Sequence, residues 1–154
     1  TPFNSGSAYQ LSGNINYSPM NHEKMVHLRA EKVARIANDL PPTEIHGDAD
    51  ADVCVLGWGS TWAAIDAAVQ RHRRRGQKVA WVHLTHLNPL PKDLGPILKG
   101  FRKVIVPELN MGQLCRIVRA EFLVDARSVS KVQGMPFTAI EIEDAIERAQ
   151  EELS

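Results

Sequence analysis

"KVIVPELNMGQL", residues 103–114, is the stretch that decides the fold. A short β-branched run ends at Glu108, and apolar residues at helical spacing follow, which predicts a strand and then a helix. Asn110 is a strong N-cap residue and Gln113 stands three positions later, so we expect the pair to form a capping box. Glu108 is left at the carboxyl end of the strand, where open α/β sheets collect ligands. A lone carboxylate without a visible partner is more typical of an ion pair or an interface contact than of a catalytic base.

The alternation of strand and helix extends from this stretch in both directions. "DVCVLG" (52–57), "KVAWVHL" (78–84) and "RSVSKVQ" (127–133) predict three more strands. Apolar residues at helical spacing predict helices after Trp62, within 91–101, across 111–122 and across 142–149. Short apolar strands joined by helices indicate crossover connections and a mainly parallel sheet covered on both faces. We therefore expect residues 51–154 to form a small three-layer α/β/α domain.

The first fifty residues follow a different pattern. Residues 1–20 are rich in Gly, Ser and Asn, which indicates a poorly structured extension or a break inside a longer chain. Residues 21–50 are expected to hold a helix and then a polar linker, because two prolines at 41 and 42 end the helical pattern. The helix has one weakly apolar side, so we expect it to lie on this domain or on a neighbour.

Composition excludes several classes of protein. A chain of 154 residues with 44% hydrophobic content can build one core. Eighteen basic residues balance eighteen acidic ones, so no net charge attracts nucleic acid or an anionic membrane. No apolar run approaches the roughly 18 residues of a membrane span. Cys54 and Cys115 show no metal-binding spacing and are expected to be buried free thiols. We therefore expect a soluble, cytoplasmic protein.

"GWGST", residues 57–61, joins a predicted strand to its helix. Its glycines allow a tight turn, and the amide groups of a helix start can hold a phosphate or another anion. The pattern lacks the third glycine of a dinucleotide site and the lysine of a P-loop. A turn capped by a hydroxyl group is the alternative. Both alternatives rest on the same residues: Gly57, Gly59, Ser60 and Thr61.

Two other polar groupings have ordinary explanations. "RHRRRG", residues 71–76, could dock an acidic partner or a phosphate, but basic residues in a last helical turn also suit the helix dipole. His83 and His86 span a strand end and a loop, without a third ligand at metal-binding spacing. No residue of the chain is therefore assigned a catalytic role or a metal.

Five segments together resemble a known family. They are "NHEKMVHLRAEKVARI" (21–36), "VLGWGST" (55–61), "HLTHLNPLP" (83–91), "VIVPELNMGQL" (104–114) and "VSKVQGMPF" (129–137). Their order over residues 13–154 is similar to the C-terminal portion of the α subunit of 2-oxoacid:ferredoxin oxidoreductases, the 2-oxoglutarate type in particular. The resemblance implies a fold like the transketolase C-terminal domain, with five strands of which one is antiparallel. The sequence pattern predicts four strands, and we expect the fifth to be a short edge strand near Ala126.

The resemblance also implies a reaction of an assembled enzyme. Thiamine diphosphate with Mg²⁺ attacks a 2-oxoacid, electrons pass singly through a 4Fe-4S cluster to ferredoxin, and coenzyme A takes the acyl group. This chain shows neither a metal–diphosphate motif nor cluster cysteines, so we do not expect it to bind these cofactors or to be catalytic alone. Its implied partners are preceding domains of the same subunit and a β subunit that carries thiamine diphosphate and the cluster, with ferredoxin as electron acceptor.

Packing and subunit association are the expected role of this segment. The resemblance implies that "GWGST" and "ELNMGQL" face the junction with those partners, with Glu108, Asn110 and Gln113 as an interface cluster. Two other hypotheses remain open. The chain could be a stand-alone module that binds a small anion at the strand ends near Gly57, Glu108 and Gly134. It could also be a scaffold without any ligand.

Overall fold

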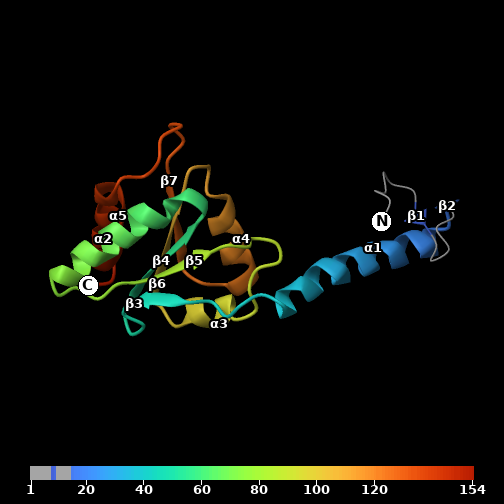
Figure 1. Ribbon diagram of the computed structural model, residues 1–154, viewed down its shortest axis with the longest axis horizontal. Helices are drawn as coiled ribbons and strands as arrows, with labels where there is room; N and C mark the ends of the chain where they lie inside the picture. Colours follow the sequence, from blue (N-terminus) through green and yellow to red (C-terminus); the bar gives the residue numbers. More distant parts are fainter. Residues whose placement is uncertain (1–7, 10–14) are drawn as a thin grey trace. The chain divides into compact units, whose positions relative to one another are not determined.

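A computed structural model describes residues 8–9 and 15–154, and these fall into two compact units (Figure 1). The smaller unit runs to Leu40 and includes Asn88–Leu90, and the larger comprises Pro41–Leu87 and Pro91–Ser154. Most of the extension expected over residues 1–20 lies outside the described residues. Within it, the short strands β1 (Ala8–Tyr9) and β2 (Ile15–Asn16) pair antiparallel.

The predicted N-terminal helix is confirmed as α1 (Pro19–Arg35), which a 3-10 turn extends over Ile36–Asn38. Pro19 is its first residue, where a missing N–H group removes no helical bond. The helix contains no buried residue, and the side of Val33 and Ile36 is exposed to 38% and 46%. Among the described residues, no helix is both long and apolar enough to cross a membrane.

The larger unit is built on a five-stranded sheet, which confirms the predicted α/β class with its mainly parallel sheet. The strand order is β3-β5-β4-β6-β7, with β3 antiparallel to β5 and all other neighbours parallel. The strands are β3 (Ile45–Gly47), β4 (Val53–Trp58), β5 (Ala80–Leu84), β6 (Lys103–Glu108) and β7 (Ala126–Ser130).

The position predicted for the fifth strand was wrong. Ala126 is the first residue of β7, which is the predicted fourth strand, and the additional edge strand is β3. β3 lies in "TEIHGDADAD", which the sequence pattern assigned to a polar linker, so the expected boundary at residue 51 cuts off a strand of the sheet. The loop after β3 is polar because its three aspartates form ion pairs with basic residues of other segments. The pairs are Asp48 with Arg73, Asp50 with Lys78 and Asp52 with Arg102.

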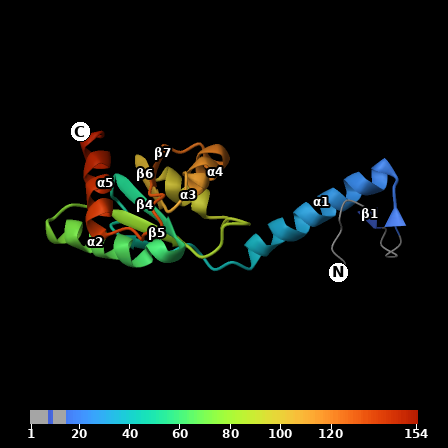
Figure 2. The same ribbon diagram turned by 90° about the horizontal axis from the view of Figure 1, so that it is seen from above.

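Helices cover both faces of the sheet, as Figures 1 and 2 show. The predicted helices are α2 (Trp62–Arg74), α3 (Leu94–Lys99), α4 (Gln113–Phe122) and α5 (Ala139–Glu151). α2 and α5 lie side by side on one face, and α3 and α4 lie on the other. Successive side chains of β4 point to opposite faces of the sheet and are buried on both. Val53 and Val55 join the core under α2 and α5, and Leu56 points to the opposite face.

The basic turn at the end of α2 binds acidic residues of the domain itself. Arg71 and Arg75 each donate to the Glu143 carboxylate of α5, at 2.8 Å, and Arg75 also reaches Glu147 at 3.1 Å. Glu143 is buried, so these bonds fix α2 against α5. Arg73 forms an ion pair with Asp48. Three arginines of this basic turn thus have partners inside the domain.

The start of α5 is closed by a capping box. The Thr138 hydroxyl accepts a hydrogen bond from the Glu141 amide at 3.3 Å, and the Glu141 carboxylate accepts one from the Thr138 amide at 2.7 Å. The Lys131 ammonium donates to both oxygens of the same carboxylate at 2.8 Å. These bonds, that from Lys131 foremost, lower the pKa of Glu141 to about 2.

Replacing two glycines tests the edge strand. Gly47 and Gly76 both have left-handed φ, +85° and +78°, so alanine is strained at either position, by about 1 kcal/mol. A Cβ atom at Gly47 would also stand 2.4 Å from the Val79 carbonyl oxygen, whereas one at Gly76 would meet nothing within 4 Å. Urea unfolding should show a loss of about 3 kcal/mol for Gly47→Ala and about 1 kcal/mol for Gly76→Ala. Equal losses would contradict the position of β3 against β5.

Acid should weaken the domain through Glu141. Its folded-state pKa lies below the ordinary value of 4.5, so its stabilising contribution is complete above pH 4.5 and is lost as the pH falls towards 2. Urea unfolding of Glu141→Gln between pH 5 and pH 2, compared with the wild type, should show a smaller decrease in stability. Glu121→Gln, at an exposed position of α4, is the control and should follow the wild type. Parallel curves for all three proteins would contradict the assignment.

Candidate functional site

The carboxyl ends of β4 and β6 form the topological switch point of the sheet. From β4 the chain crosses to β5 on one side, and from β5 it returns to β6 on the other side of β4. Open α/β sheets hold ligands in the crevice at such a point. A pocket of about 330 Å³ opens here, and we call it the switch-point pocket. Its lining residues are Trp58, Gly59, Ser60, Thr61, Leu109, Asn110 and Gln113.

Five of the seven predicted site residues thus line one pocket, although 48 residues separate the two segments that supply them. Gly59, Ser60 and Thr61 follow β4, and Asn110 and Gln113 follow β6. They meet because adjacent parallel strands end at the same edge of the sheet. Sequence reasoning missed Trp58 and Leu109, the apolar part of the lining, although both stand beside the predicted residues.

The turn after β4 is closed by Thr61. Its hydroxyl oxygen accepts from the Trp58 amide at 3.2 Å, and the hydroxyl donates to the Trp58 carbonyl at 2.9 Å. Gly59 has φ +60°, which this tight turn requires. The side chain of Thr61 is therefore occupied within the turn, while Ser60 is exposed and α2 has no side-chain cap at its start.

Gly57 does not line the pocket and has a packing role. A Cβ atom at this position would lie 2.3 Å from the Ile65 side chain of α2 and 3.0 Å from the Thr61 hydroxyl. Gly57 therefore lets α2 approach β4 closely, and its side of the strand faces the core of the domain.

Glu108 lies inside the domain, and its carboxylate holds the start of α4. The side chain is fully buried, and its two oxygens accept from the Leu114 amide at 2.8 Å and the Cys115 amide at 3.0 Å. A buried carboxylate at a helix N-terminus satisfies otherwise unpaired amides and suits the helix dipole. In this structure Glu108 therefore has an internal role, where the sequence favoured an ion pair or an interface contact.

Asn110 forms the local turn before α4. Its side-chain oxygen accepts from the Gly112 amide at 2.9 Å and from the Gln113 amide at 3.0 Å. The predicted capping box is not formed, because the helix begins later than expected. Gly112, with φ +77°, is the N-cap, and Gln113 is the first helical residue. Its side chain lines the pocket.

The two histidines considered as metal ligands have different partners. His83 lies in a cluster of aromatic rings, 4.9 Å from Trp62, and burial lowers its pKa. His86 shares a hydrogen bond with the Thr85 hydroxyl at 2.9 Å. Within the described residues, no three His, Cys, Asp or Glu side chains gather where a metal could bind. The sequence pattern gave no sign of the ring cluster, in which Trp62 and His46 also contact Trp81.

The two cysteines lie in the core as free thiols, as predicted. Burial raises the pKa of Cys54, and burial and the neighbouring Glu108 carboxylate raise that of Cys115. Both thiols are therefore protonated at neutral pH and are poor nucleophiles or metal ligands.

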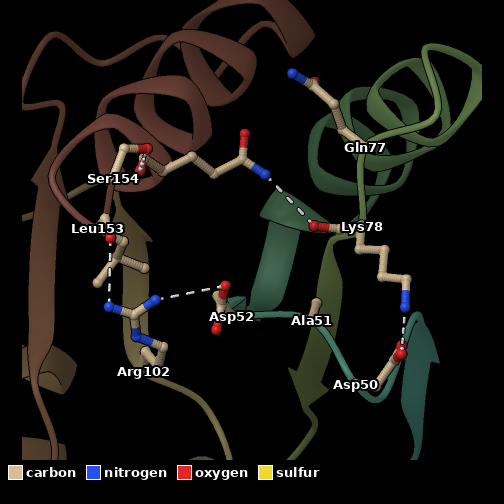
Figure 3. A pocket seen from close by; sticks show the side chains of 9 residues that line it. Asp50, Ala51, Asp52, Gln77, Lys78, Arg102, Leu153 and Ser154 are labelled. Carbon is tan, nitrogen blue, oxygen red and sulfur yellow. Dashed lines mark hydrogen bonds and ion pairs between the residues drawn. The ribbon is translucent and has the colours of Figure 1, made fainter.

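A second pocket of about 330 Å³ lies at the opposite end of the sheet (Figure 3). Its charged groups already have partners: Lys78 pairs with Asp50, and Arg102 donates to the Leu153 carbonyl at 3.3 Å and lies 3.7 Å from Asp52. Because these charges compensate each other, the lining residues that the structure describes offer an anionic or cationic ligand no unpaired side-chain charge.

The amino-acid sequence of this chain is similar to a known domain family and to subunits of known oxidoreductases. Residues 51–147 match the family described as pyruvate:ferredoxin oxidoreductase core domain II. The chain is 47% identical, over 132 residues, to the 2-oxoglutarate oxidoreductase subunit KorA of Mycobacterium tuberculosis, covering 85% of this chain and 20% of that protein. It is 30% identical, over 152 residues, to the α subunit of 2-oxoacid:ferredoxin oxidoreductase 2 of Aeropyrum pernix, covering 95% of this chain and 24% of that one.

A solved structure is similar over nearly the whole chain. It is the 2-oxoglutarate:ferredoxin oxidoreductase of Magnetococcus marinus with 2-oxoglutarate, coenzyme A and succinyl-CoA bound. The TM-score is 0.85 at 33% identity, and the match covers 94% of this chain and 26% of that one. The present chain thus spans about a fifth to a quarter of the length of these three proteins.

Truncation of Glu108 should destabilise the domain. Glu108→Ala leaves two buried amides without their charged acceptor and should lower the free energy of unfolding by about 3 kcal/mol. Asn110→Ala removes the side-chain hydrogen bonds of a more exposed turn and should lower the free energy of unfolding by about 1 kcal/mol. Urea unfolding followed by circular dichroism measures both. A Glu108→Ala protein as stable as the wild type would show that the carboxylate does not hold α4.

Proposed function

Since this chain belongs to the family of pyruvate:ferredoxin oxidoreductase core domain II, we propose that it is the corresponding α/β domain of a 2-oxoglutarate:ferredoxin oxidoreductase α subunit. The observation that carries the proposal is the identity to the Mycobacterium tuberculosis subunit over most of this chain. The similarity to the Magnetococcus marinus enzyme, a structure that holds 2-oxoglutarate and succinyl-CoA, supports the same substrate.

The proposed reaction belongs to the assembled enzyme. 2-Oxoglutarate loses carbon dioxide, its remaining acyl group passes to coenzyme A, and two electrons pass one at a time to ferredoxin. Thiamine diphosphate, Mg²⁺ and an iron–sulfur cluster would supply this chemistry. The residues of this chain do not fit these groups, because the described part of the chain has no cluster of metal-ligating side chains and its cysteines are buried thiols. We assign all three to other parts of the enzyme.

The contribution of this domain is association with the rest of the enzyme through the switch-point pocket. The pocket is open, and Trp58 and Leu109 give its lining an apolar part. Asn110 and Gln113 offer side-chain amides at the opposite wall. These groups suit a side chain or backbone segment of a preceding domain or of the β subunit, with Glu108 stabilising the wall from inside.

A small-anion module remains the second candidate. It is favoured by the start of α2, which has no side-chain cap, and by Ser60 in the preceding turn, which lines the pocket. No lysine or arginine is among the lining residues, so an anion would lack a charged partner. Calorimetric titration with phosphate and with 2-oxoglutarate distinguishes the candidates, and binding at the pocket would favour the module.

Activity of the reconstituted enzyme tests the proposal. The full-length α subunit, expressed with its β subunit, should reduce ferredoxin with 2-oxoglutarate as donor, and only when coenzyme A is present. Pyruvate is the comparison substrate and should react more slowly. Absence of turnover with 2-oxoglutarate, in a complex that reduces ferredoxin with another 2-oxoacid, would contradict the proposed substrate.

Filling the pocket tests its role in association. Gln113→Trp places a large ring in the switch-point pocket and should weaken assembly about tenfold or more, a change of at least about 1.4 kcal/mol. Gln77→Trp is the matched control, because Gln77 is also exposed and lines the equally large pocket at the other end of the sheet. Sedimentation velocity of the complex measures both. Equal assembly of the two variants would contradict the assignment.

A further inference from the structure

The segment that leads from β7 into the first turn of α5 exposes large apolar side chains. Val132, Met135 and Ile140 are exposed to 62%, 61% and 62%, and no charged residue stands between positions 132 and 140. We call residues 132–140 the apolar loop. Figure 1 shows it projecting beyond the carboxyl ends of the strands.

Lys131 fixes the base of the apolar loop. Its side chain is only 8% exposed, and its ammonium group donates to the Pro136 carbonyl at 2.9 Å and to the Glu141 carboxylate at 2.8 Å. Its backbone amide donates to the Glu108 carbonyl at 2.9 Å, which ties the loop to the end of β6. One buried lysine thus bonds to the end of β6, to the loop itself and to the first turn of α5.

A second anchor lies within the loop itself. Phe137 is 8% exposed and belongs to the core under α2 and α5, with the Lys131 ammonium 5.7 Å from its ring centroid. The loop therefore has two fixed points, and the exposed side chains stand on a segment whose backbone is restrained. Exposed apolar groups on a restrained, uncharged protrusion are characteristic of a protein contact.

We propose that the apolar loop docks on an apolar surface of another domain of the same subunit. This inference rests on the proposed function, in which the chain is one domain of a larger subunit. In the three similar proteins, about three quarters or more of the polypeptide lies outside the region matched here. A covalently connected domain has a high effective concentration at the loop, which favours it over a separate molecule. Because the loop carries no charged residue, we expect the surface on which it docks to be apolar.

Photo-cross-linking in the assembled full-length enzyme tests the proposal. A photoreactive phenylalanine analogue at position 135 replaces Met135, and irradiated enzyme is digested and analysed by mass spectrometry. Leu123, which is 87% exposed at the end of α4, carries the same probe as the control. We expect cross-links from position 135 to peptides of the same polypeptide outside this domain. Cross-links only to the β subunit or to a second copy, or a yield no higher than at Leu123, would overturn the proposal.

Variants separate the loop's position from its chemistry. Met135→Asp keeps the anchors but places a charge in the contact, so limited proteolysis of the full-length subunit should become faster. Lys131→Ala should do the same by releasing the loop, and Lys131→Arg should restore part of the protection. If Met135→Asp leaves proteolysis unchanged, the docking inference fails. The proposed function fails separately, through absence of 2-oxoglutarate turnover in an enzyme that still gives the cross-link.

Discussion

The buried carboxylate of Glu108 is the constraint on which the carboxyl end of the sheet depends. Its two oxygens bind the first amides of α4, and its backbone carbonyl accepts from Lys131 at the end of β7. One residue thus connects β6, α4 and the segment that leads to α5. A buried carboxylate without hydrogen-bond donors would be strongly destabilising, so the start of α4 must lie where its amides reach Glu108. This requirement fixes residues 109–113, which form one wall of the switch-point pocket.

Local sequence patterns predicted those strands and helices in which the spacing of apolar residues along the chain matches the positions that are buried. β4 and β6 are β-branched and buried along most of their length, and α2 and α4 repeat apolar residues at helical spacing. β3 could not be predicted in this way, because its three residues show no buried position. It is formed by pairing with β5 and by Asp48, which accepts from the Val79 amide 31 residues away. Such non-local bonds leave no trace in a short window of sequence.

The same distinction explains how much of the candidate site could be predicted. Asn110 bonds amides two and three residues away, so its role in the turn followed from local rules. The convergence of "GWGST" with "ELNMGQL" followed from the parallel sheet. The burial of Glu108 did not, because it requires the later helix start that the left-handed Gly112 sets. The domain therefore contributes shaped surfaces, the switch-point pocket and the apolar loop, and its buried charged groups stabilise them.

Hydrogen exchange at the start of α4 measures the central interaction most directly. The first amides of a helix normally exchange quickly, because no helical acceptor faces them. If Glu108 holds them, the Leu114 and Cys115 amides should exchange only through global unfolding, at rates like that of Val55 in the central strand β4. Exchange of these two amides orders of magnitude faster than that of Val55 would contradict the account.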